Sequence, residues 1–189
     1  MDKSRLAAFS DGFLAIVITI MVLELRPPAG TQWQALEAVA PSFAVYALSF
    51  AYLGIYWNNH HHFFHLVERV NGAMLWANLH LMFWLSLIPF ATAWLGEHPR
   101  AAVPTAAYGI AMLLPGMAWS LMAAAAVRAQ GPGSKLAQAM GRDLKSKLSI
   151  ALYAAGIASA FASPAAADAF YIIVALMWLV PDRRVERAL

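Results

Sequence analysis

Six long apolar runs follow one another along the chain, and they limit the folds that the chain can adopt more than any other feature. Their approximate bounds are 6–25, 36–60, 73–95, 103–127, 147–163 and 166–180. A helix that spans a bilayer needs about 20 mostly apolar residues, so the last two runs are short for a span. We expect an all-α polytopic membrane protein with six transmembrane helices per subunit.

The composition supports this class. Of the 189 residues, 61% are hydrophobic and only 12% are charged, whereas a soluble domain carries about 25% charged residues. There is no cysteine, which rules out disulfides and thiolate metal sites. The net charge of +3 and the absence of basic patches interleaved with aromatics argue against a nucleic-acid partner. No catalytic or nucleotide motif is present, so the sequence predicts no enzyme, no cofactor, and one membrane domain over 1–189.

The basic residues are distributed unevenly between the two sets of loops. Only Arg26 and Arg100, of the 13 Lys and Arg, fall on one side of the predicted membrane. The other eleven are Lys3, Arg5, Arg69, Arg128, Lys135, Arg142, Lys145, Lys147, Arg183, Arg184 and Arg187. Positively charged loops stay in the cytoplasm, so both termini are predicted to be cytoplasmic.

The first apolar run carries charged and polar residues near its start, which is costly in a membrane and typical of a functional place. At 100° per residue, one face of this helix is mostly apolar, with a single hydroxyl. Its members, within about 40° of a common line, are Arg5, Gly12, Ile16, Thr19 and Leu23, with Phe9 and Ile20 on the flank. Ser10 and Asp11 point away from that face. Such a stripe is, by itself, more often helix-packing surface than pore.

Two other polar groups are available to satisfy Asp11. The second run ends in Trp57-Asn58-Asn59-His60-His61-His62-Phe63-Phe64-His65, and Asn78 lies inside the third run. The second and third helices are expected to meet at the cytoplasmic side, at the depth where the first helix begins. We therefore predict a network of Arg5, Asp11, His60 and Asn78 that fixes the rotation of the first helix.

The histidine run also suggests a metal site, because His61 and His65 have the spacing of a helical ligand pair. No carboxylate or thiol follows at ligand spacing except Glu68. Two imidazoles alone leave a zinc site incomplete, and interfacial polar residues are the commoner explanation. The sequence therefore predicts no metal.

Several of these residues form a recognisable motif. Arg5-x-x-x-Phe9-Ser10-Asp11-Gly12, with Ala15-Ile16 and Thr19 after it, resembles the start of the endosomal and lysosomal transmembrane potassium channels and their bacterial relatives. Trp57-x-x-His60, Asn78 and Pro89-Phe90 match further markers of that family. The matching motifs cover roughly the first half of the chain.

The resemblance implies a homotetramer of six-helix subunits, with four copies of the first helix lining a central pore. It implies hydrophobic constrictions at Ile16, Ile20 and Leu23, and a hydroxyl ring at Thr19 that contributes to ion selectivity. Four Thr19 hydroxyls replace part of the hydration shell of a permeant K⁺ ion, and a narrow apolar ring gates by dewetting. The remaining motif residues would form a structural and gating network: Arg5, Phe9, Ser10, Asp11, Trp57, His60 and Asn78.

We therefore expect a K⁺-permeable leak channel, selective for K⁺ over Na⁺, in a prokaryotic plasma membrane. Two alternatives remain open at this point. One is a proton- or cation-conducting channel with little selectivity. The other is a secondary transporter for metal ions that uses the His60–His65 cluster.

Overall fold

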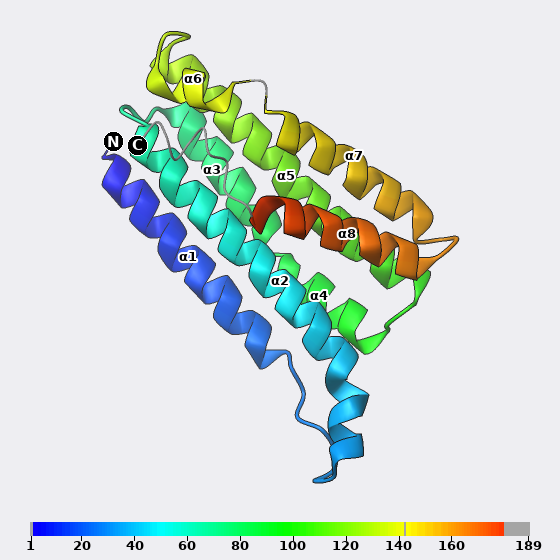
Figure 1. Cartoon of the computed structure of the whole chain (residues 1–189). Helices are drawn as coiled ribbons and strands as arrows, with labels where there is room; N and C mark the ends of the chain where they lie inside the picture. Colours follow the sequence, from blue (N-terminus) through cyan, green and yellow to red (C-terminus); the bar gives the residue numbers. More distant parts are fainter. Residues whose placement is uncertain (1, 142, 180–189) are drawn as a thin grey trace.

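The structure is a computed structural model that describes residues 2–141 and 143–179 (Figure 1). Every regular element in these ranges is an α-helix. The helices are α1 (Lys3–Leu23), α2 (Trp33–Leu66), α3 (Gly72–Leu85), α4 (Ile88–Glu97), α5 (Ala102–Gln130), α6 (Lys135–Met140), α7 (Leu144–Ser159) and α8 (Pro164–Leu179). The all-α prediction is therefore confirmed for the part of the chain that the structure describes.

Four helical segments are long and apolar enough to cross a membrane. They are α1, α2, α5 and the stretch formed by α3 and α4 together. The helices α7 and α8 have 16 residues each, about 24 Å at 1.5 Å per residue, which is less than the roughly 30 Å of a hydrocarbon core. The helix α7 begins three residues before the predicted run 147–163 and ends four residues before its end. The helix α8 begins two residues before the predicted run 166–180, and residue 180 lies outside the described residues. Six complete crossings remain a prediction.

The apolar run 73–95 forms two helices rather than one. The helix α3 ends at Leu85, and α4 begins at Ile88 with Pro89 in its first turn. A proline has no backbone N–H and its ring clashes with the preceding turn, so the helical hydrogen-bond ladder breaks just before it. A proline inside an apolar run is a local signal for such a break, and the structure locates the break at Ser86 and Leu87.

The helix α5 lies at the centre of the subunit, where it packs against α3, α4, α7 and α8. The helix α1 lies at one edge, beside α2 and α4 (Figure 1). The tightest approach involves Tyr171 of α8, whose ring fits against Gly109 of α5 and Gly156 of α7. A Cβ atom at Gly109 would lie 2.1 Å from the Tyr171 hydroxyl, and one at Gly156 would lie 2.5 Å from the Tyr171 ring. Glycine is needed at both positions because any side chain would displace this ring.

Hydroxyl groups connect three further helices in the interior. Ser49 of α2 and Tyr108 of α5 share a hydrogen bond of 2.9 Å, and Thr92 of α4 donates to Ser49 over 2.7 Å. All three side chains are buried. In a membrane, buried hydroxyls that bond across helices satisfy each other where no water is available.

Polar contacts also tie the helix ends together near the start of α1. The Lys3 ammonium donates to the Val67 carbonyl over 2.9 Å, which joins the start of α1 to the end of α2. The Gln130 side chain at the end of α5 accepts from the backbone N–H groups of Glu68 and Arg69, 3.2 Å from each, and donates to the Arg69 carbonyl over 2.7 Å. These contacts fix the ends of α1, α2 and α5 at a common level.

Candidate functional site

The helix α1 presents two different faces. One face is buried in the subunit against α2 and α4, with side chains that are at most 4% exposed. These residues recur every three or four positions: Leu6, Ser10, Leu14, Val17 and Met21. This spacing follows from 3.6 residues per turn, which brings such positions onto one side of a helix.

The opposite face of α1 is uncovered in the subunit. Ile16 is 58% exposed, Ile20 44% and Leu23 81%. Arg5, Phe9, Gly12 and Thr19 are exposed on the same side. The residues that the sequence assigns to the constriction and the hydroxyl ring thus share a face that no element of the described chain covers.

Thr19 is the one hydroxyl within this exposed stripe. Its Oγ1 donates to the Ile16 carbonyl over 2.8 Å. Because the hydroxyl proton is used in this backbone bond, the oxygen keeps its capacity to accept. Such an oxygen is able to accept a hydrogen bond or coordinate a cation.

A directed chain of hydrogen bonds anchors the buried face of α1 to α2 and α3. His60 Nε2 donates to Asn78 Oδ1 over 2.9 Å, Asn78 Nδ2 donates to Ser10 Oγ over 3.0 Å, and Ser10 Oγ donates to the Leu6 carbonyl over 3.0 Å. All three side chains are at most 1% exposed. The amide oxygen of Asn78 only accepts, so His60 carries its proton on Nε2.

This arrangement differs from the predicted network. Ser10 occupies the place that the sequence assigned to Asp11. Asp11 Oδ1 is buried and has no hydrogen-bond partner among the described residues, and Arg5, which is exposed, forms no ion pair within them. The difference arises because neighbouring residues on a helix point 100° apart, so only one of Ser10 and Asp11 can face Asn78.

Asp11 instead lines a hollow of about 310 Å³ at the start of α1. The histidines His60, His61 and His65 of α2 line the same hollow. The carboxylate lies beside this hollow with its Oδ1 buried. Asp11 thus lies near His60 at this hollow, but its Oδ1 forms no hydrogen bond with the Ser10–Asn78–His60 chain.

Phe9 and Trp57, the remaining motif residues, lie on the surface. Phe9 is 50% exposed, with its ring 6.4 Å from that of Phe13, and Trp57 is 46% exposed. The Trp57 ring stacks on His61 with centroids 6.0 Å apart. The structure therefore does not bring these two residues into the hydrogen-bonded chain of Ser10, Asn78 and His60.

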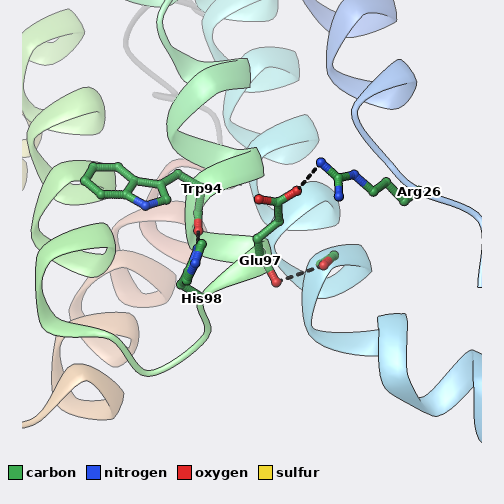
Figure 2. A network of polar contacts seen from close by, with 6 residues as sticks. Arg26, Trp94, Glu97 and His98 are labelled. Atoms are coloured by element: carbon green, nitrogen blue, oxygen red, sulfur yellow. Dashed lines mark hydrogen bonds and ion pairs between the residues drawn. The ribbon is translucent and has the colours of Figure 1, made fainter.

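The sequence reasoning missed a polar contact at the other end of α1. Figure 2 shows Arg26, just after α1, reaching Glu97 at the end of α4, with 2.9 Å between Nη2 and Oε1. Nearby, His98 Nδ1 lies 3.3 Å from the Trp94 carbonyl. The sequence holds one signal for the pair: Arg26 follows the first apolar run and Glu97 follows the third, so both fall on the same side of the predicted membrane.

Potential metal ligands are sparse. No group of three or more His, Asp or Glu side chains able to hold a metal occurs in residues 2–141 and 143–179. His61 and His65 do approach each other, with their Nε2 atoms 3.1 Å apart. They lie at one end of α2, beside the hollow that Asp11 lines.

Comparison with known proteins agrees with this geometry. The family model described as endosomal/lysosomal potassium channel TMEM175 matches residues 5–89, which include α2, α3 and all but the first two residues of α1. A potassium channel from Chryseobacterium sp. (strain P1-3) is 51% identical over 189 residues, covering 100% of this chain and 98% of the relative. The human endosomal/lysosomal proton channel TMEM175 is 31% identical over 115 residues, which cover 53% of this chain and 23% of the human protein.

A solved structure has the same fold. The crystal structure of a lysosomal potassium-selective channel TMEM175 homolog from Chamaesiphon minutus superposes with a TM-score of 0.82 at 27% identity. The match covers 95% of this chain and 97% of that one. The likeness therefore extends through α5, α7 and α8, beyond the part that the motifs cover.

Proposed function

Because this chain belongs to the TMEM175 family of endosomal/lysosomal potassium channels, we propose that it is a K⁺-permeable leak channel whose pore is lined by α1. Membership in the family makes it a cation channel and a multi-pass membrane protein, which is not a class of enzyme. We further propose that the channel selects K⁺ over Na⁺, that it assembles from four copies, and that residues of α1 line its pore.

The observation that carries the proposal is the exposed stripe of α1. Apolar exposure alone does not identify a pore, because Leu121 of α5 and Ile172 of α8 are also exposed and lipid covers such side chains. The α1 stripe differs because it carries the hydroxyl of Thr19 within its apolar part. Polar groups inside a membrane face the bundle interior or a water-filled path, so this stripe is better suited to a pore than to lipid.

The proposed ion path follows from the order of side chains along α1. Four copies of Ile16, Ile20 and Leu23 would form apolar rings, and such rings gate by closing or by losing water. Four Thr19 oxygens between the first two rings would replace part of the K⁺ hydration shell. K⁺ gives up water more easily than Na⁺, so the ring favours K⁺, although less strongly than stacked carbonyl oxygens do.

The proposal includes the organisation of the subunit in the membrane. Residues 1–189 would form a single six-helix channel domain in a bacterial plasma membrane, with both termini in the cytoplasm. The charge distribution supports this orientation: the described basic residues Lys3 and Arg69 lie at the end where α1 begins, whereas Arg26 lies at the other end. The predicted cytoplasmic residues Arg142, Arg183, Arg184 and Arg187 lie outside the described residues.

The test is ion flux into liposomes that contain the purified protein. Under a K⁺ gradient, we expect flux above that of empty vesicles, and slower flux under an equal Na⁺ gradient. Absence of K⁺ flux would refute the channel proposal for this chain. Equal rates of K⁺ and Na⁺ flux would contradict only the proposed selectivity for K⁺ over Na⁺.

A proton-conducting channel is a second candidate, because the human relative is named a proton channel. A pH-sensitive dye trapped in the same liposomes separates the two candidates. Acidification driven by a proton gradient, with no K⁺ flux under a K⁺ gradient, would favour proton conduction.

The metal-ion transporter receives less support. Transporter sites lie near the middle of the membrane at discontinuous helices, whereas His61 and His65 are exposed at one end of the continuous helix α2. Saturable metal uptake that is lost in His61→Ala would restore this alternative.

A further inference from the structure

The pair His61 and His65 has a geometry that the proposed pore does not use. The two residues lie one turn apart on α2, both are exposed, and their Nε2 atoms are 3.1 Å apart. Their ring centroids are 4.6 Å apart with the planes at 76°. The two Nε2 atoms therefore lie within hydrogen-bond distance of each other.

The distance between the nitrogens fits a shared metal ion. With Zn–N bonds of about 2.05 Å, an Nε2–Nε2 distance of 3.1 Å corresponds to an angle of about 98° at the metal. This value lies between the octahedral and tetrahedral angles of about 90° and 109°, which are the common geometries of divalent metals in proteins. Without metal, a hydrogen bond between the two imidazole rings accounts for the distance of 3.1 Å. When a metal ion binds, one of the rings has to rotate so that the lone pairs of both Nε2 atoms point to the ion.

The surroundings favour a cation at this point. His61 and His65 line the hollow of about 310 Å³ that Asp11 and His60 also line. Asp11 Oδ1 and His60 Nδ1 are buried there without hydrogen-bond partners among the described residues. The hollow has room for water molecules, so water bound to an ion on the histidines could in turn donate to the carboxylate. The ammonium of Lys3 also lines this hollow and donates to the Val67 carbonyl over 2.9 Å, so its positive charge opposes a cation there while the Asp11 carboxylate attracts one.

Trp57 orients one of the two ligands. Its ring stacks on His61 at an interplanar angle of 28°, which limits the positions of that imidazole. A ligand whose orientation is fixed before binding loses less conformational entropy when the metal binds. Trp57 is thus a positioning residue for this pair.

We propose that His61 and His65 form a binding site for a divalent transition metal ion at the mouth of the Asp11 hollow, with water completing the coordination. Imidazole ligands favour Zn²⁺, Cu²⁺ and Ni²⁺, whereas Ca²⁺ and Mg²⁺ require oxygen ligands. The site is on α2, apart from the exposed stripe of α1. It depends on these two side chains and not on the proposed channel activity.

The experiment is metal binding to the purified full-length chain, prepared without a histidine tag. Zn²⁺ or Ni²⁺ is titrated in competition with a chromophoric chelator, and Mg²⁺ is tested in parallel. We expect one site per subunit for Zn²⁺ and Ni²⁺ and none for Mg²⁺ under the same conditions. His61→Ala and His65→Ala should each weaken binding by about tenfold or more, since loss of an outer-shell partner of a metal ligand already costs 10–100-fold.

The matched control is His98→Ala, which removes another exposed histidine at the end of α4. Its affinity for Zn²⁺ should equal that of the unchanged protein. Thermal unfolding without metal checks each variant, and His65→Gln replaces His65→Ala if the alanine variant does not fold. Equal Zn²⁺ affinity in the unchanged protein and in the folded double variant of His61 and His65 would overturn the proposal, as would an equal loss in His98→Ala.

Discussion

The two sides of this subunit solve the problem of burying apolar residues in different ways. Around α5, the ring of Tyr171 fills a space that only glycine at 109 and 156 leaves open. On α1, the side chains of Ile16, Ile20 and Leu23 remain exposed within the part of the chain that the structure describes. The apolar side chains of the first region are fully packed within one chain. The exposed face of α1 is covered only when lipid or another copy of the chain packs against it, or when it lines a pore.

Because of this difference, substitutions in the two regions should affect different properties of the protein, stability in the first region and ion flux in the second. A change near Tyr171 acts on packing that already exists in one subunit, so it should alter the unfolding of that subunit. A change on the outer face of α1 removes few contacts within the subunit, so it should alter ion flux or assembly while the fold persists. The two outcomes can be measured on the same purified protein.

The largest effect is expected from a comparison of the two faces of α1. Leu14 is 1% exposed and Ile16 is 58% exposed. Leu14→Ala should destabilise the subunit by about 2–5 kcal/mol, because it leaves a cavity. Ile16→Ala should change stability by less than about 0.5 kcal/mol but raise K⁺ flux, because it widens the proposed constriction. Thermal unfolding and liposome flux test both variants, and equal destabilisation by the two would contradict the assignment of faces.

A smaller effect is expected at the centre of the subunit. Gly109→Ala places a Cβ 2.1 Å from the Tyr171 hydroxyl, and such overpacking costs about 1–3 kcal/mol. The control is Gly116→Ala on the same helix, where the nearest atom, the Tyr56 hydroxyl, is 3.8 Å away. The melting temperature should fall only for the first variant. A fall of similar size in both would mean that Tyr171 is free to move aside.

Thr19→Val should leave the stability almost unchanged, since the side chain is exposed and keeps nearly the same shape. It removes the oxygen that the proposal places next to the ion. The ratio of K⁺ to Na⁺ flux should therefore fall toward one. An unchanged ratio would show that selectivity arises elsewhere.

The smallest effect is expected at the ion pair of Arg26 and Glu97, whose side chains are 82% and 46% exposed. Exposed pairs contribute about 0–1 kcal/mol and are weakened by salt. Glu97→Gln should lower the melting temperature slightly at low ionic strength and not at high ionic strength. A large loss at both would indicate that this contact holds α1 in place.

The sequence predicted some features well because they depend on one helix alone. The exposure of Ile16, Thr19 and Leu23 follows from the periodicity of α1, and the position of the bend before α4 follows from Pro89. Both are local consequences of backbone geometry, so no knowledge of the neighbouring helices is needed.

The partners of those residues were harder to predict. The sequence shows that Ser10 and Asp11 leave the apolar stripe, but the rotation of α1 against α2 and α3 decides which of them reaches Asn78. The hydrogen bonds from the backbone of Glu68 and Arg69 to the Gln130 side chain connect residues about 60 positions apart. No local sequence pattern predicts them. The same holds for Tyr171 against Gly109, since a tyrosine in an apolar helix does not reveal which glycine it meets.

The most direct test of the account uses the absence of cysteine from the chain. Ile16→Cys introduces a single thiol at the proposed constriction, and Ile172→Cys, on an exposed position of α8, is the control. Ag⁺ is a monovalent cation that bonds thiolates, so it should stop K⁺ flux through Ile16→Cys and leave Ile172→Cys and the unchanged protein conducting. Continued K⁺ flux through Ile16→Cys after Ag⁺ has titrated its thiol would contradict a pore lined by α1.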